Sequence, residues 1–379
     1  MHVAKISFAP QHGLQLDEPL DGQPDIVLYF GARKALASCN VFSRLATAFP
    51  RSIIVGCSTA SQIQDYELID DDQIACVGLK FAKTTVRLSH AEVPSMTHSR
   101  SCGRNVGAAL RAADLAGVFV LSDGLNVNGS ELIRGISEEV EPHVVLTGGL
   151  AGDGASFQET LVGANGPPQA HQVAAIGFYG DAVRIGHGSA GGWDVFGPWR
   201  RITRATSNVL LELDTEPALD LYERYLAEEA AGLPGTGLLF PLQIQNPTNA
   251  AHCIVRTILA VDRKTRSVTF AGNVPEGWLA RLMRGNMDRL AAGAAEAARQ
   301  ARRGIDCGGL ALLVSCVGRH LLMGQHTSDE LEAVASELGH DFRSVGFYSY
   351  GEISPHALSG VRELHNQTMT ITTIGEVAV

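Results

Sequence analysis

The sequence of 379 residues lacks the features that would assign it to a membrane, a secretory pathway or a nucleic acid. No apolar run approaches the roughly 20 residues that a membrane-spanning helix needs. The first 25 residues carry scattered charged and polar side chains and do not resemble a signal peptide. Lys and Arg number 30 against 40 Asp and Glu, so the net charge is −10 and no basic excess favours nucleic acid or anionic lipid. We therefore expect a cytoplasmic protein that binds neither.

The seven cysteines form no disulfide or metal pattern. Their number is odd, they are scattered, and no pair has the C-x-x-C spacing of a structural zinc site. The same absence excludes covalent haem attachment through C-x-x-C-H. The 13 histidines contain no H-E-x-x-H spacing either. We expect most of the cysteines to be small buried apolar residues.

Alternating strand and helix patterns predict a mixed α/β fold. Residues 25–30 and 52–57 are short apolar runs typical of buried strands, and an amphipathic helical pattern separates them. The second half contains a predicted helix over 217–231, a hairpin over 254–271 and an Ala-rich helix over 278–303. We expect two halves, residues 25–214 and 215–374, each with a mixed β-sheet covered by helices and packed as a layered sandwich.

A glycine-rich stretch at residues 186–193, GHGSAGGW, lies between these halves. Gly186, Gly188 and Gly191 spell the G-x-G-x-x-G of dinucleotide sites, which requires a strand before it and a helix directly after it. Pro198 follows too closely for such a helix to begin. The glycines therefore favour a tight turn with exposed backbone rather than a nucleotide site.

A short internal echo occurs late in each half, IGFYGD from Ile176 and VGFYSYGE from Val345. Because the chain has 41 glycines, such a match arises easily by chance, and a duplicated architecture stays open on this observation.

Seven short motifs are spread along the chain. Four lie in the first part: GCSTA at Gly56, GGLAGD at Gly148, GHGSAGGW at Gly186 and NVLLELDTEPALDLY at Asn208. Three lie in the second part: SCVGR at Ser315, GFYSYGEISP at Gly346 and LHNQTMT at Leu364. Each motif is weak alone, but together they resemble the FIST family, which has an N-terminal and a C-terminal FIST domain, and they occur in the order of the family from about residue 25 to residue 372.

The resemblance implies a sensory module of bacterial signalling rather than an enzyme. Its ligand would be a small molecule, with amino acids as one class, and its output would reach a partner such as a histidine kinase or a cyclic-di-nucleotide enzyme. Some free-standing members of the family sense nitric oxide through haem. A homodimer is compatible with this picture.

A haem in this chain would be haem b, held without a covalent bond and most simply by one neutral imidazole on the iron. His187 is the first candidate because it lies in a family motif beside glycines, and His365 and His320 follow. The alternative is that each imidazole only hydrogen-bonds a buried carbonyl and fixes a turn. Ser189 and Trp193, in the same motif as His187, are further candidates for a ligand pocket.

An amino-acid-like ligand is the alternative to haem. Its ammonium needs a carboxylate, which Glu352 offers at the end of an apolar strand, and its carboxylate needs N–H donors. Arg319 and Arg256 are candidates for the latter role, and His365 and Asn366 add polar side chains near Glu352 in the sequence. A buried polar network that only fixes two strands explains the same residues.

A hydrolase or transferase is the remaining hypothesis. Cys57 and Ser58 follow a buried strand in GCSTA, which is similar to a nucleophile elbow. An elbow is followed by a helix, whereas this segment leads into the acidic run at residues 70–72, and no paired base is identifiable. We therefore predict a sensor without catalytic residues.

Overall fold

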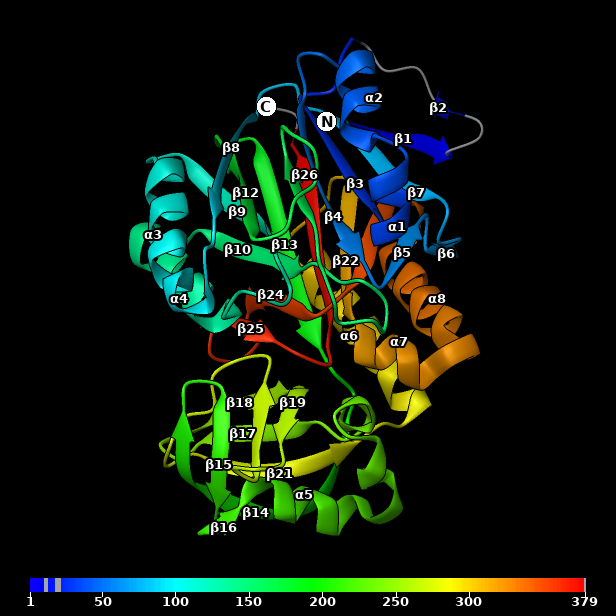
Figure 1. Cartoon of the computed structure of the whole chain (residues 1–379). Coiled ribbons are helices and arrows are strands. Elements are labelled where there is room, and N and C mark those ends of the chain that lie inside the picture. Colours follow the sequence, from blue (N-terminus) through cyan, green and yellow to red (C-terminus); the bar gives the residue numbers. More distant parts are fainter. Residues whose placement is uncertain (10–12, 18–21, 378–379) are drawn as a thin grey trace.

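The computed structural model describes residues 1–9, 13–17 and 22–377, and it has the mixed α/β fold that the sequence predicts. Figure 1 shows a large upper part that contains both ends of the chain and a smaller lower part. The lower part is residues 194–284 and is called the β domain; the other described residues are called the body. Residue 214, where the sequence suggested a boundary, lies within the β domain.

Three sheets of the body share one strand order. In each sheet the first strand pairs antiparallel with the fourth, the fourth pairs antiparallel with the second, and the second pairs parallel with the third. The strands of the first unit are β1 (His2–Ala9), β3 (Ile26–Ala32), β4 (Ile53–Thr59) and β7 (Ile74–Lys80). Those of the second are β8 (Thr85–Glu92), β9 (Leu115–Ser122), β10 (Val145–Leu150) and β12 (Gln172–Tyr179). Those of the third are β13 (Val183–Ala190), β22 (Gly309–Cys316), β23 (Phe342–Ser349) and β26 (Met369–Glu376).

Helices connect the parallel strands of each unit, as a crossover between parallel strands requires. The connections are α1 (Arg33–Ser38) with α2 (Val41–Ala48), then α4 (Gly129–Glu139), then α7 (Val317–Met323) with α8 (Thr327–Leu338). Between the first and second strands lie α3 (Ser99–Leu110) in the second unit and α6 (Met287–Arg302) in the third, whereas the first unit has strand β2 (Gly13–Leu16). Helix α3 packs on α4, and α6 packs on α8.

Each unit donates the strands after its third strand to another unit, and the three donations close a ring. The donated elements are β5 (Ser61–Gln64) with β6 (Glu67–Ile69) to β23, β11 (Val162–Ala164) to β4, and β24 (Gly351–Pro355) with β25 (Arg362–His365) to β10. Equivalent backbone hydrogen bonds mark the three crossings: Ala60 N–H to Tyr348 O at 2.9 Å, Gly152 N–H to Ser58 O at 2.9 Å, and Tyr350 N–H to Leu150 O at 3.2 Å. The body is therefore a triplicated fold.

One glycine recurs at the same position of each third strand. A Cβ on Gly56, Gly148 or Gly346 would overlap the backbone oxygen of the residue opposite it on the second strand. The echo between Ile176 and Val345 does not mark the repeat, because Ile176 lies in a fourth strand and Val345 in a third.

The β domain is inserted between β13 and α6 of the third unit. Its sheet contains β14 (Asp194–Thr206), β15 (Val209–Leu213), β16 (Glu216–Pro217), β17 (Leu242–Asn246), β18 (Asn249–Arg256), β19 (Ile258–Asp262), β20 (Ser267–Phe270) and β21 (Leu279–Arg284). Helix α5 (Ala218–Leu226) packs on this sheet around a core separate from those of the body. The prediction of a helix over residues 278–303 was wrong for residues 279–284. These residues form strand β21, which pairs with β14 and β17.

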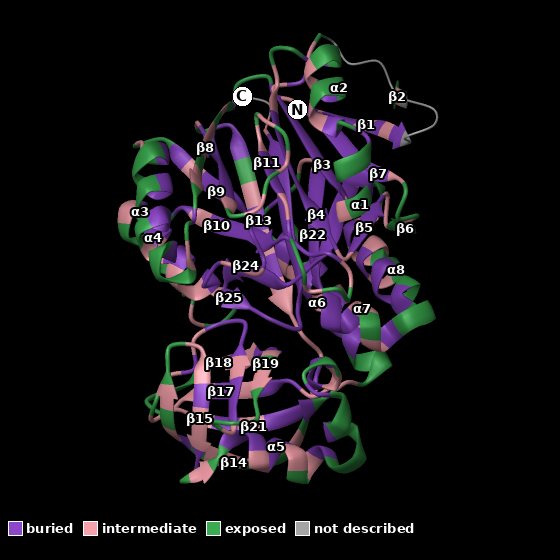
Figure 2. Ribbon diagram, viewed as in Figure 1, coloured by how far each residue is buried: buried purple, intermediate pink, exposed green. Residues whose placement is uncertain are grey.

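The largest core lies between the three sheets of the body, where Phe30, Phe119 and Phe347 each come from a different sheet. Figure 2 shows buried strands inside and exposed residues on the outer faces of the helices. Among the described residues, no helix has both the length and the apolar character needed to cross a membrane.

Candidate functional site between the body and the β domain

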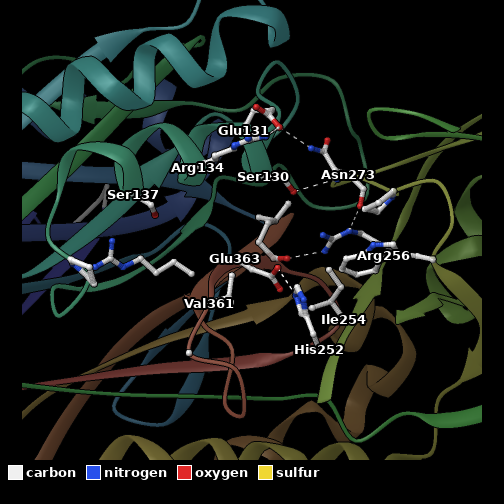
Figure 3. Close-up of a pocket in the computed structure, with 16 residues that line it drawn as sticks. Ser130, Glu131, Arg134, Ser137, His252, Ile254, Arg256, Asn273, Val361 and Glu363 are labelled. Carbon is white, nitrogen blue, oxygen red and sulfur yellow. Dashed lines mark hydrogen bonds and ion pairs between the residues drawn. The ribbon is translucent and has the colours of Figure 1, made fainter. Parts of the chain in front are cut away.

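A cavity of about 530 Å³ lies where the β domain meets the second unit of the body. Figure 3 shows its walls, which come from α4, from the segment around β25 and from the β domain. Helix α4 contributes Ser130, Glu131, Arg134 and Ser137; the β25 segment contributes residues 360–364; the β domain contributes His252, Ile254, Arg256, Asn273, Pro275 and Trp278. Such a volume is within the range of small-molecule sites.

Asn273 holds the β domain against the start of α4. Its Nδ2 donates to Glu131 Oε1 at 2.9 Å, its Oδ1 accepts from Asn128 Nδ2 at 2.9 Å, and its backbone N–H donates to Ser130 Oγ at 3.3 Å. Asn128 is also the N-cap of α4, since its Oδ1 accepts the N–H of Glu131. The start of the helix and the wall of the cavity are thus fixed by the same residues.

Arg256 is a buried cation on the cavity wall, with 3% of its surface exposed. Its Nε donates to Asn273 O at 2.9 Å and its Nη1 to Leu364 O at 2.8 Å. Burial lowers the pKa of Arg256 to about 10, so the guanidinium stays charged at neutral pH. In the described part of the chain no carboxylate lies within the 4.0 Å of an ion pair, and Nη2 has no hydrogen-bond partner. A buried cation without an anionic partner lowers the stability of the folded protein, and a bound anion would remove this cost.

Glu363 is an anion at the same cavity, and one of its two carboxylate oxygens has no hydrogen-bond partner among the described residues. Its Oε1 is 2.6 Å from His252 Nε2 of the β domain, while the buried Oε2 has no partner among the described residues. The His252 ring packs edge-on against Trp278, with 5.1 Å between the ring centroids. The buried hydroxyl of Ser137 is also unpartnered and lines the cavity.

Two further arginines add positive charge. Arg362 donates to the backbone oxygens of Val144 and Glu141, and burial lowers the pKa of its guanidinium. Arg134 lies 4.0 Å from Glu131 and 3.8 Å from Glu138. Three arginines and two glutamates therefore line one cavity of a protein with a net charge of −10. This wall favours a ligand that carries an anionic group.

The chain matches the FIST N domain over residues 25–216 and the FIST C domain over residues 218–355. It belongs to the FIST family. FIST domains are sensory modules that bind small ligands in signalling proteins, which agrees with the prediction of a sensor. A comparison with curated proteins found no match. Among solved structures, a cyanuric acid hydrolase from A. caulinodans is similar at 11% identity and a TM-score of 0.18, over 78% of this chain and 100% of that chain. That likeness is too low to bear on activity.

In this FIST protein, Glu352, His365 and Asn366 form a buried group directly behind the cavity wall. Glu352 accepts from Ser349 Oγ at 2.6 Å and from Thr368 Oγ1 at 3.0 Å, and burial raises its pKa to about 8. His365 Nε2 is 3.0 Å from Ser354 O, and burial lowers the pKa of His365 to about 3. His365 and Asn366 directly follow Leu364, and Glu352 pairs with His365 in the hairpin, but none of the three lines the cavity.

Arg319, Trp193 and Ser189 lie where the β domain joins the body. Arg319 and Glu330 form a fully buried ion pair at 2.6 Å, and Arg319 also donates to Gly191 O. Trp193 Nε1 donates to Gln367 O at 2.7 Å, and Ser189 Oγ lies 3.0 Å from Thr370 Oγ1. These contacts fix the linker before β14; a ligand-binding role for the three residues stays a prediction.

Residues 186–190 of the glycine-rich motif belong to strand β13 rather than to the predicted tight turn, and residues 191–193 lead to β14. Gly186 and Gly188 lie in β13, and a Cβ on either would overlap a backbone oxygen of α6. The glycines allow close contact between a helix and a strand.

Two of the three candidate iron ligands already have partners, and none of the three lines the cavity. His320 Nδ1 is 3.2 Å from Thr327 Oγ1 and its ring packs on Tyr348, and His365 is enclosed as described above. His187, on β13, is partly buried, burial lowers its pKa, and it is not among the residues that line the cavity. Within the described ranges, no three His, Cys, Asp or Glu side chains are arranged to hold a metal ion.

Arg256 was a candidate from the sequence, but its neighbours in the cavity were not. Glu363, His252, Asn273 and Glu131 lie in four separate segments, and none belongs to a spacing motif. The only sequence signal near them was the polar run that starts at His365, directly after Glu363 and Leu364.

Proposed function

We propose that this FIST protein senses a small zwitterion of the amino-acid class in the cavity between the body and the β domain. The observation that carries the proposal is the pair of unused charged atoms on one wall, Arg256 Nη2 and Glu363 Oε2. A ligand carboxylate can accept from the guanidinium while the ligand ammonium donates to the glutamate. Ser137 Oγ offers a further polar contact.

The mechanism is a shift between two arrangements of the β domain. The β domain joins the body through residues 191–193 and residues 285–286, and its other contacts include Asn273 with α4 and His252 with Glu363. A ligand that touches Arg256 of the β domain and Glu363 of the body favours the arrangement that keeps these two parts together. A partner such as a histidine kinase or a cyclic-di-nucleotide enzyme would read that arrangement, as the family resemblance implies.

Two other hypotheses receive less support. A haem-based nitric oxide sensor rests on the family resemblance, and none of its candidate histidines lines the cavity. A hydrolase or transferase would need a reactive Ser58 or Cys57. Ser58 is buried with its Oγ accepting the N–H of Leu161 at 2.8 Å, and burial raises the pKa of the Cys57 thiol well above its usual value. Neither residue has the features of an activated nucleophile.

Thermal unfolding in the presence of each of the twenty standard amino acids tests the proposal. A ligand at a hundred times its Kd stabilises the native state by about 2.7 kcal/mol, which raises Tm by several degrees. We expect at least one amino acid to raise the Tm of the wild type and of Arg263→Gln, whose exposed side chain lies elsewhere on the β domain. The same amino acid should leave the Tm of Glu363→Gln and Arg256→Gln unchanged.

Glu363→Gln retains an acceptor for His252, so it separates loss of binding from loss of folding. Circular dichroism checks that each variant is folded. The proposal is wrong if no amino acid shifts the wild-type Tm, or if the shift persists in folded Glu363→Gln.

A further inference from the structure

The groove covered by the β domain in the second unit has an open counterpart in the third unit. Gly148 and Gly346 occupy the same position in their third strands. Ser130 precedes Gly148 by as many residues as Ser328 precedes Gly346. The same spacing matches Arg134 with Glu332, Ser137 with Ala335 and Pro142 with His340. Residues of both sets line cavities; the first set lies on α4 and, for Pro142, just after it, and the second lies on α8 and, for His340, just after it.

The donated hairpins extend this equivalence. Ile353 pairs with Gly148, and Leu364 pairs with Ile353; in the third unit Ile63 pairs with Gly346, and Leu68 pairs with Ile63. Leu68 is thus the counterpart of Leu364, and by the same registers Glu67 is the counterpart of Glu363. A glutamate followed by a leucine therefore lines both grooves.

The two grooves differ in what covers them. In the second unit, β18 of the β domain supplies His252 to Glu363 and Arg256 to the backbone oxygen of Leu364, and Leu364 is fully buried. In the third unit the corresponding groove has a volume of about 900 Å³, and Leu68 is 37% exposed. Figure 1 shows the β domain below β25, whereas β6 and α8 lie on a side of the body that it does not reach.

The charge of the open groove indicates what it can receive. Asp65, Glu67 and Glu332 line it together with Arg343. Asp65 is paired with Lys5 at 2.8 Å, but for the side chains of Glu67 and Glu332 no partner exists among the described residues. Glu332 lies at the position that Arg134 has in the covered groove, so the open groove is the more acidic of the two.

We propose that the groove between α8 and the β5–β6 hairpin binds a separate protein through an extended segment that presents arginine and histidine, as β18 does in the covered groove. One basic side chain would pair with Glu67 and another would reach the backbone oxygen of Leu68. Glu332 adds a second carboxylate for a partner more basic than β18. This inference does not depend on the ligand proposed for the cavity.

A peptide of residues 249–258, with Cys253→Ser and a fluorescent label, is the probe, because it carries His252 and Arg256 in the sequence context of β18. Its fluorescence anisotropy is titrated with the full-length protein at low salt. We expect saturable binding that weakens at least tenfold in Leu68→Asp and in Glu67→Lys, while Met96→Asp, an exposed position in the second unit, binds as the wild type does. A peptide with Arg256→Glu should not bind.

The remaining outcomes overturn the proposal. Absence of saturable binding, or equal binding by folded Leu68→Asp, shows that the groove does not take such a segment. Binding that survives Leu68→Asp but is lost in Glu363→Gln places the peptide in the covered groove. A wild-type dimer in sedimentation equilibrium that becomes a monomer in Leu68→Asp identifies the occupant as a second copy of this chain rather than a separate protein.

Discussion

Glu363 of the body and His252 of the β domain approach to 2.6 Å at the wall of the cavity. Their contact links the two spatial parts of the molecule, and it occupies only one oxygen of the carboxylate. The same glutamate therefore holds the β domain in place and offers an oxygen to a ligand.

This contact should couple the stability of the two parts. We expect a double-mutant cycle of His252→Ala and Glu363→Gln to give a coupling energy of about 1–2 kcal/mol, because both groups are largely shielded from water. Urea unfolding of the wild type, the single variants and the double variant measures it. Additive effects of the two substitutions would show that the contact contributes nothing to stability.

The buried pair of Arg319 and Glu330 should be essential to the fold. Removal of one partner in Glu330→Gln leaves an uncompensated buried charge, and we expect a loss of about 3–5 kcal/mol in the free energy of unfolding. The exposed pair of Arg299 and Glu337 is the control, and Glu337→Gln should cost less than about 1 kcal/mol. Equal effects in the two variants would contradict the difference in burial.

Glu352 should make stability fall as the pH rises from about 4.5 to about 8. Its folded pKa is raised to about 8, so the native state binds the proton more tightly than the unfolded chain does. The stabilising contribution is complete below the unfolded pKa, near 4.5, and is lost as the pH rises through 8. We expect Glu352→Gln to gain stability relative to the wild type between pH 6 and about pH 9 in thermal unfolding. A constant difference over that range would mean that Glu352 is ionised in the native state.

The recurring glycine of the third strands should not tolerate a side chain. In Gly346→Ala the new methyl group would overlap Leu313 O, and we expect a loss of at least about 1–3 kcal/mol. Gly235→Ala is the matched control because its Cβ would meet open space. Chemical denaturation compares the two, and an unaffected Gly346→Ala would show that strands β22 and β23 can separate at no cost.

Haem binding through His187 can be tested by absorption spectroscopy. Since His320 and His365 are engaged within the fold and none of the three candidate histidines lines the cavity, we expect stoichiometric haemin to give no sharp, saturable Soret band, and His187→Ala to behave as the wild type does. A sharp band that disappears in His187→Ala would restore the haem hypothesis and identify the ligand.

The sequence by itself determined the fold class, the family and the absence of a metal motif, because these depend on local patterns. Short apolar runs predicted β3 and β4, and the FIST motifs are contiguous stretches that need no partner to be recognised. The helical periodicity gave a wrong prediction at residues 279–284. These helix-forming residues are strand β21, because β21 hydrogen-bonds to β14 on one side and to β17 on the other.

Only the tertiary structure decided the triplicated body, the inserted β domain and the cavity between them. Strand donation joins residues far apart in the chain, such as Ser61 with Tyr348 or Gly148 with Ile353, and no local pattern encodes that pairing. The site follows the same rule. Glu363 looks like an ordinary surface charge in the sequence. It becomes part of a candidate binding site with Arg256 because folding brings the buried Arg256 and the buried Oε2 of Glu363 to one cavity without giving either group a complete set of partners among the described residues.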